Sequence, residues 1–235
     1  MPPASSVAEP TVVLVHGAWA DASSWRRVIL LLQQAGVAVV AVQNPTSSLA
    51  ADVAATRHAI GQLPGPVVLA GHSWGGTVIT EAGNDPKVKA LVFVAAFAPD
   101  VGESTGDQVA AHPAPPGLST VSADSTGSLV MSVDGFIRNV AQDLPEQEAR
   151  VLAAVAPPLG AGTFGDKVTQ AAWQTRPNWY LLSNEDRAVS VELQHELASR
   201  LKARTTELAA SHMSLLSQPQ AVADAILDAV RAVRG

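Results

Sequence analysis

Four short apolar runs near the start of the chain constrain its fold most strongly. They lack the polar alternation of half-exposed strands. They occupy Thr11–Val15 and residues 37–42, 67–70 and 89–97. Segments with helical spacing of apolar residues, such as 24–35 and 49–60, separate them. Because apolar strands that alternate with helices are typical of a parallel sheet covered on both faces, we expect a three-layer α/β sandwich.

The same alternation returns near the C-terminus. We expect strands at residues 179–182 and 205–209 and helices at 191–202 and about 222–233. Between residues 99 and 177 the alternation stops, and that segment has expected helices at 128–142 and 145–156, with Pro145 in a first helical turn. The pattern predicts a core of residues 11–98 and 178–235, an inserted cap at 99–177 and a flexible tail at 1–10.

Composition excludes several classes of protein. With 47% hydrophobic and 15% charged residues, the 235-residue chain can bury a sizeable core. Its net charge is −6 and its basic residues form no stripe, so we expect no nucleic-acid partner. The absence of Cys excludes disulfides, Cys zinc sites and thiol nucleophiles. No apolar run approaches the roughly 18 residues of a membrane span, and the first ten residues lack Lys and Arg, so we expect no membrane segment, no secretory signal and a cytoplasmic location.

Ser73 is the candidate nucleophile. It stands in the sequence G-H-S-W-G-G at residues 71–76, between the expected strand at 67–70 and a following helix. A strand, sharp turn and helix with the pattern G-x-S-x-G is the setting of a nucleophile elbow. Glycines there permit strained backbone angles and let neighbouring segments approach closely.

The sequence H-G-A-W at residues 16–19 follows the first strand, so its loop should lie at the same sheet edge as Ser73. In such a site, two backbone N–H groups stabilise the oxyanion of the reacting carbonyl. We expect them to come from Ala18 and from Trp74, the residue after the nucleophile. His16 and Trp19 are more simply explained as a structural loop histidine and a pocket wall.

A serine nucleophile needs a general base, and only one of six histidines is well placed. His212 follows the last expected strand, in a loop that should stand beside Ser73. The others lie in expected helices, in the cap, or in the loops already described.

Asp186 is the candidate acid that would orient the imidazole of His212, because it follows the expected strand at 179–182 and adjoins the His212 loop. Glu185 and Asp100 are rivals: Glu185 is adjacent, and Asp100 follows the preceding strand of the sheet.

Together these residues resemble the α/β-hydrolase superfamily, from about residue 11 to 233. The chain order Ser73, Asp186, His212 is the order of nucleophile, acid and base in that superfamily. Within it, the chain resembles the group of small esterases, plant methyl esterases and hydroxynitrile lyases. Lyases of that group typically have Lys after the catalytic histidine and Thr in the oxyanion loop. Met213 and Ala18 stand there, so the resemblance implies an esterase with the α/β-hydrolase fold and its cap.

The cap suggests an apolar or aromatic ester as substrate, because it has mixed helices and few charges. Tentative substrate-binding residues are Trp19, Phe136, Ile137 and Met213, with Met131 and Phe164 as further candidates. No metal-binding or phosphate-binding motif follows a strand, so we expect no metal and no cofactor. A cofactor-free lyase, perhydrolase or C–C hydrolase using the same residues is the alternative, and a non-enzymatic ligand receptor is a third.

Overall fold

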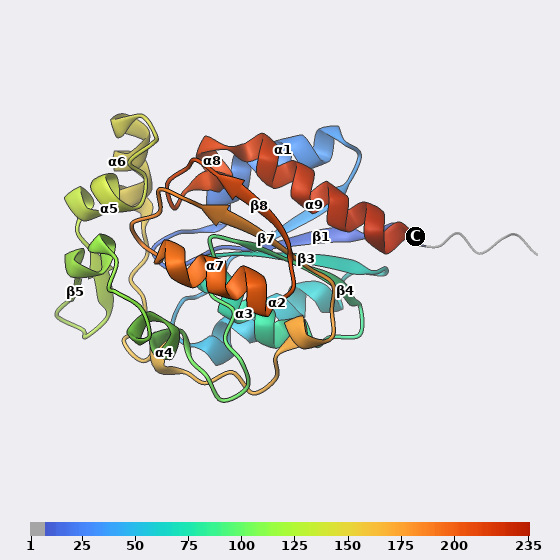
Figure 1. The fold of residues 1–235 in the computed structure, drawn as a ribbon, viewed down its shortest axis with the longest axis horizontal. Coiled ribbons are helices and arrows are strands. Elements are labelled where there is room, and N and C mark those ends of the chain that lie inside the picture. The colour runs from blue at the N-terminus through green and yellow to red at the C-terminus, as the bar shows by residue number, and fades with distance from the viewer. Residues whose placement is uncertain (1–7) are drawn as a thin grey trace, which may run out of the picture.

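A six-stranded parallel sheet forms the centre of the protein, which we describe from a computed structural model covering residues 8–235. The strand order is β2-β1-β3-β4-β7-β8, and every neighbouring pair runs parallel (Figure 1). The strands are β1 (Thr11–Val15), β2 (Ala38–Val42), β3 (Val67–His72), β4 (Val88–Val94), β7 (Asn178–Ser183) and β8 (Arg204–Leu208). All of the expected strands are therefore present. The carboxyl ends of β3, β7 and β8 lead into the loops that carry Ser73, Asp186 and His212.

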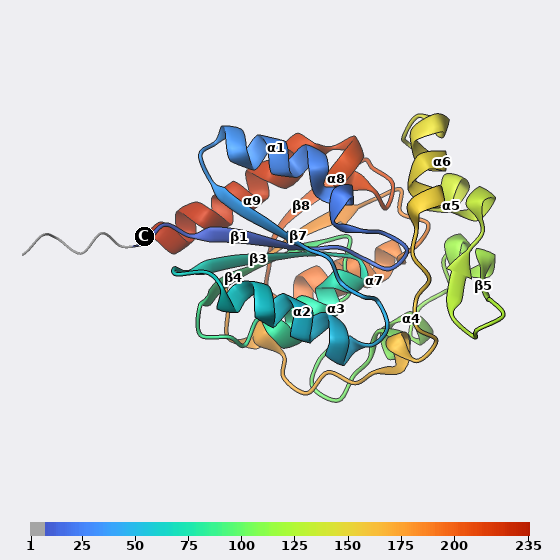
Figure 2. The same cartoon turned by 180° about the vertical axis from the view of Figure 1, so that it is seen from behind.

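Successive residues of the central strands point to opposite faces, and each face has its own apolar cluster. Val12 and Leu14 of β1 pack with α1 (Arg26–Gln34), α8 (Ser214–Ser217) and α9 (Pro219–Arg234). Val13 and Val15 pack on the other side with α2 (Leu49–Gly61), α3 (Trp74–Ala82) and α7 (Val191–Arg200). The two helical layers are visible above and below the sheet in Figures 1 and 2. This confirms the predicted three-layer α/β sandwich.

The segment between β4 and β7 lies largely at one end of the sheet, on the left of Figure 1. It contains α4 (Thr105–Ala110), a two-stranded antiparallel ribbon of β5 (Val121–Ala123) and β6 (Leu129–Met131), α5 (Val133–Asn139) and α6 (Glu146–Val155). Four short 3-10 helices complete the described chain: Ala22–Trp25, Pro116–Thr120, Thr163–Gly165 and Ala172–Gln174.

The prediction of a helix at residues 128–142 is wrong for its first residues. Leu129–Met131 pairs with Val121–Ala123, across a turn in which Gly127 has a φ of +85° that favours glycine. The helix starts only after Ser132, whose hydroxyl accepts a hydrogen bond from the N–H of Gly135. The polar cap at Ser132 and pairing with the preceding strand therefore override the local helical spacing. The helix expected at 145–156 is confirmed as α6, with Pro145 immediately before it.

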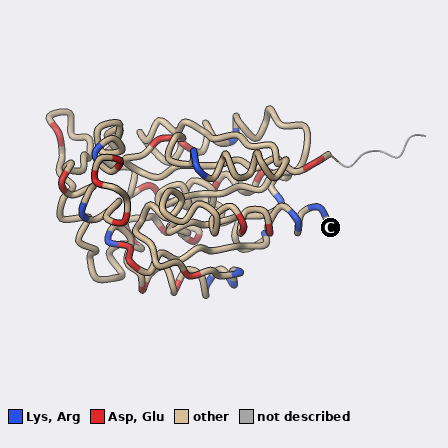
Figure 3. Tube along the Cα trace, turned by 90° about the horizontal axis from the view of Figure 1, so that it is seen from above, with Lys and Arg blue, Asp and Glu red and all other residues tan. Residues whose placement is uncertain are grey.

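Charged residues are dispersed along the trace, with Lys and Arg interspersed among Asp and Glu (Figure 3). Within residues 8–235, no helix combines the length and hydrophobicity needed to cross a bilayer. Residues 1–7 of the expected tail lie outside the described part of the chain.

Gly76 in α3 provides a stability test of close backbone packing. A Cβ at this position would lie 2.1 Å from the carbonyl oxygen of Phe97 and 2.7 Å from Cβ of Ala96. We therefore expect Gly76→Ala to lower the free energy of unfolding by about 3 kcal/mol, although alanine is the better helix former. Gly61, at the end of α2, has no atom within 4 Å of such a Cβ. Gly61→Ala should instead raise the free energy of unfolding by about 0.5–1 kcal/mol. Urea unfolding measures both, and equal effects of the two substitutions would contradict the packing argument.

Candidate active site

Ser73 lies at a sharp turn between β3 and α3. Its φ of 54° and ψ of −124° place a non-glycine residue in the left-handed region of φ, where the backbone is strained. The neighbouring backbone maintains this geometry: the N–H of Ser73 donates to the carbonyl of Val94, and the Ser73 carbonyl accepts from the N–H groups of Gly76 and Phe97. The turn exposes the Ser73 side chain to a cavity at the carboxyl end of the sheet.

Asp186 and His212 form a buried pair. The distance between Asp186 Oδ2 and His212 Nδ1 is 2.7 Å, and both residues are more than 90% buried. The carboxylate also accepts from the backbone N–H groups of Ala188 and Val189 and from the side-chain amide of Gln194. Since the carboxylate oxygen accepts, His212 Nδ1 is the donor, which leaves Nε2 as the basic nitrogen of the neutral ring.

The structure brings Ser73 and His212 to one narrow cavity. Ala18 also lines it. Within the described residues, no hydrogen bond joins the hydroxyl of Ser73 to His212. Such contacts are often loose in proteins without a bound substrate and tighten when it binds.

His16 orients the loop before Ala18. The N–H of Asn44 donates to His16 Nε2 at 2.9 Å, so the ring proton is on Nδ1, which donates to the carbonyl of Gly17 at 2.9 Å. The described peptide bonds are all trans, so the N–H of Ala18 points away from that carbonyl. Gly17 packs directly against the turn at Ser73, since a Cβ at Gly17 would lie 2.7 Å from Cβ of Ser73. Burial lowers the pKa of His16, which favours this neutral form.

Trp74 is anchored by the buried carboxylate of Asp52, which is not among the residues expected at the site from the sequence. Its indole N–H donates to Asp52 Oδ2 at 2.8 Å, and Asp52 Oδ1 accepts from the N–H of Thr46. Burial raises the pKa of Asp52, and these two hydrogen bonds oppose that shift. The backbone N–H of Trp74 is the first of α3 and has no intrahelical acceptor. The sequence signal for this contact was Asp52 itself, a charged residue on the apolar face of the expected helix at 49–60.

His72 is a second buried imidazole beside the His212 loop. Its Nε2 lies 2.9 Å from the backbone carbonyl of His212, so this nitrogen is the protonated one, and the two rings are 4.6 Å apart between centroids. Burial, together with the adjacent His212, holds the pKa of His72 well below its usual value. Its ring therefore supports the His212 backbone as a neutral donor.

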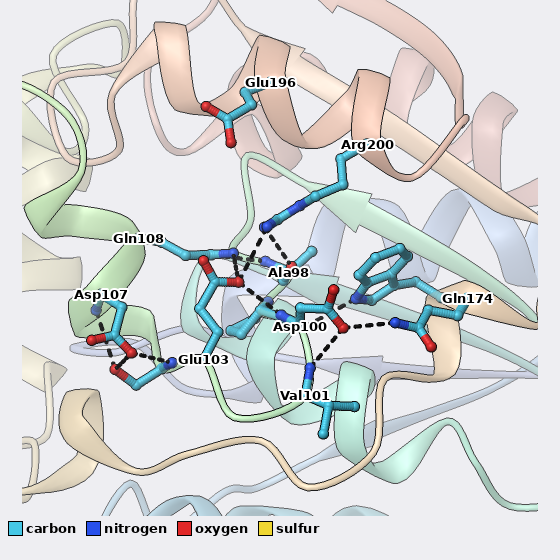
Figure 4. Close-up of polar contacts among 12 residues, drawn as sticks. Ala98, Asp100, Val101, Glu103, Asp107, Gln108, Gln174, Glu196 and Arg200 are labelled. Atoms are coloured by element: carbon cyan, nitrogen blue, oxygen red, sulfur yellow. Dashed lines mark hydrogen bonds and ion pairs between the residues drawn. The ribbon is translucent and has the colours of Figure 1, made fainter.

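Neither rival acid contacts His212. Figure 4 shows the Asp100 carboxylate directed toward Val101 and Gln174, with hydrogen bonds of 2.7 and 2.6 Å. Glu185 is exposed, although its backbone belongs to the same loop as Asp186.

Mostly apolar side chains line the rest of the cavity. Of the four tentative substrate-binding residues, Trp19 and Phe136 line it, as do the further candidates Met131 and Phe164. Ile137 and Met213 are not among the described lining residues, and Met213 borders a neighbouring hollow instead. Five lining residues lie outside the set expected from the sequence: Phe97, Leu118, Val140, Ala188 and Val189. They come from loops and cap segments whose proximity no local pattern reveals. No cluster of three or more potential metal ligands occurs among residues 8–235.

A profile of the α/β-hydrolase family matches residues 12–225. The chain therefore belongs to this family of enzymes, and the resemblance inferred from its motifs is confirmed.

Its relatives include several hydrolases. Methylesterase 2 of Arabidopsis thaliana is 26% identical over 248 residues, covering 92% of this chain and 94% of that protein. A carbendazim hydrolyzing esterase of a Nocardioides species is 32% identical over 106 residues, covering 39% of this chain and 44% of that protein. The crystal structure of a pyrethroid hydrolase from Sphingobium faniae has a TM-score of 0.82 at 19% identity, covering 95% of this chain and 98% of that one. The similarity to the pyrethroid hydrolase structure supports the α/β-hydrolase fold.

The buried imidazoles should make stability depend on pH. Because the pKa of His72 is lower in the folded protein than in the unfolded chain, only the unfolded chain binds a proton just below pH 6.5, the ordinary histidine value. The free energy of unfolding should therefore fall as the pH drops below about 6.5. His72→Gln, measured by urea unfolding between pH 5 and 8, should reduce this slope. His58→Gln on the exposed side of α2 serves as the control and should leave the slope unchanged. An identical slope in both variants would refute this account of His72.

Proposed function

We propose that this protein hydrolyses a small carboxylic ester with an apolar or aromatic group, through a covalent acyl-enzyme on Ser73. The observation that carries the proposal is the convergence of Ser73, at a strained turn, with the buried pair of Asp186 and His212 at one cavity. A serine hydroxyl is a weak nucleophile at neutral pH and requires an adjacent base. The free Nε2 of His212 supplies one.

In the proposed mechanism, Ser73 Oγ attacks the ester carbonyl while His212 Nε2 takes the hydroxyl proton. His212 then gives this proton to the departing alcohol, and the acyl group remains on Ser73. Water attacks the acyl-enzyme with His212 again as the base, which releases the carboxylic acid and restores Ser73. Asp186 keeps the Nδ1 proton in place and stabilises the imidazolium that forms in each step.

The N–H groups of Ala18 and Trp74 are the proposed donors to the oxyanion. Both belong to segments beside Ser73, and both are held by side chains buried behind them, His16 and Asp52. Donors fixed before the reaction stabilise developing negative charge more effectively than mobile water.

The proposed substrate class follows from the cavity. Its walls carry four aromatic side chains, Trp19, Phe97, Phe136 and Phe164, and apart from His212 its lining residues have no ionisable side chain. Transfer of a charged group into such a cavity is costly, so we favour uncharged esters. Names of relatives such as methylesterase and carbendazim hydrolyzing esterase support ester hydrolysis.

The first functional prediction concerns the nucleophile. Ser73→Ala should reduce turnover of p-nitrophenyl and methyl esters at least ~10⁴-fold, because the attacking oxygen is lost while packing barely changes. A panel of esters of graded size measures this loss, and circular dichroism checks the fold. Normal turnover by a folded Ser73→Ala protein would exclude Ser73 as the nucleophile.

The second functional prediction separates the candidate acids. Asp186→Asn should lower kcat by about 10³–10⁴-fold, since an amide would favour the wrong tautomer of His212. Asp100→Asn is the matched control, because its carboxylate contacts Val101 and Gln174, and kcat should change less than about threefold. Steady-state kinetics on one ester decide between them. The reverse ranking would assign the acid role to Asp100.

A further inference from the structure

Two consecutive cap residues contact the loops of the acid and the base. Asp143, between α5 and α6, accepts two hydrogen bonds from Ser211: the N–H to Oδ2 at 2.8 Å and the hydroxyl to Oδ1 at 2.5 Å. Gln142 donates from its side-chain amide to the carbonyl of Glu185 at 2.6 Å. Ser211 directly precedes His212, and Glu185 directly precedes Asp186. The cap thus contacts the residue immediately before each member of the pair.

The Ser211 contacts restrict the backbone on both sides of His212. Ser211 is fully buried, and its hydroxyl oxygen accepts from the N–H of Met213 while donating to Asp143. The hydroxyl therefore links the residues before and after His212. The carbonyl of His212 itself accepts from His72. With these contacts, the His212 backbone has little freedom to shift relative to the cap.

The acid loop is bound to the base loop as well as to the cap. The N–H of Glu185 donates to the carbonyl of Ala210, and the N–H of Gly117 in the cap donates to the carbonyl of Arg187. Gln142 and Asp143 consequently hold two loops that are already joined to each other. A shift of about 1 Å in a reacting group can cost 10²-fold in rate, so this support bears on catalysis.

Asp143 suits this contact because a carboxylate offers two acceptor oxygens to two donors of one residue. An asparagine has one acceptor oxygen, and its amide would face a donor of Ser211. The same cap region supplies Phe136 and Val140 to the cavity wall. Cap residues that would contact the substrate are therefore continuous with those that hold the base loop.

We propose that Asp143 is a positioning residue for His212, acting through Ser211, and that Gln142 supports Asp186 in the same way through Glu185. This inference rests on the proposed ester hydrolysis at Ser73. The cap then has a second role beyond enclosing the substrate: it maintains the distance between the acid and the base.

The test compares Asp143→Asn with Asp134→Asn on the same ester. Asp134 is a cap carboxylate of α5 that pairs with Arg138 at the surface, so its variant controls for loss of a charge. We expect Asp143→Asn to lower kcat about 10–100-fold with KM changed less than threefold, assayed well below its Tm. Asp134→Asn should retain wild-type kcat.

A spectroscopic measurement tests whether Asp143 positions His212 or merely attaches the cap to the core. The Nδ1 proton shared by His212 and Asp186 should give a downfield proton NMR signal, assigned by its loss in Asp186→Asn. Asp143→Asn should shift or broaden this signal, whereas Asp134→Asn should not. A lower Tm or a higher KM in Asp143→Asn, with kcat and the signal unchanged, would overturn the inference.

Two further variants keep the outcome decisive. If Asp143→Asn does not fold, Ser211→Ala removes one hydroxyl only, and unchanged kcat in that variant would overturn the inference. If Asp143→Asn and Ser211→Ala both fold, the double variant should lose less kcat than the two single losses combined, because both substitutions break the same contact. Ser73→Ala is assayed in parallel: its full activity would refute the proposed function, whereas an inactive Ser73→Ala with a fully active Asp143→Asn would refute only the role of Asp143.

Discussion

The close approach of three backbone segments around Ser73 is the constraint on which the rest of the site depends. Gly17 packs against Cβ of Ser73, Gly75 against the carbonyl of Val15, and Gly76 against the carbonyl of Phe97. Side chains at these glycines would separate the segments. Their contact allows Ser73 to adopt a positive φ, and it brings the loops after β1 and β4 to the same point. The cavity and the candidate oxyanion donors both follow from this crowding.

Three histidines lie close to Ser73, and their different hydrogen-bond partners give the same type of side chain different roles. His16 accepts from one backbone N–H and donates to one carbonyl, and His72 donates to the carbonyl of His212. Burial lowers the pKa of both, so each acts as a neutral support. Only His212 pairs with a carboxylate and borders the cavity. The candidate base is thus distinguished by its surroundings.

The cap contributes more than a cover to this arrangement. Its side chains form part of the cavity wall, and its residues Gln142 and Asp143 reach the loops before Asp186 and His212. The segment that contributes Phe136 and Val140 to the cavity wall therefore also contacts the residues directly before Asp186 and His212.

The sequence by itself determined the sheet, its helices and the positions of Ser73, Asp186 and His212 in the chain. Apolar strands and glycine-rich turns are local patterns, and the carboxyl ends of parallel strands meet at one edge. Only the tertiary structure decided that Leu129–Met131 forms a strand, because its partner and the Ser132 cap override local spacing. It also revealed Asp52, Asp143 and most of the cavity wall, since contacts between residues far apart in the chain leave no periodic signal.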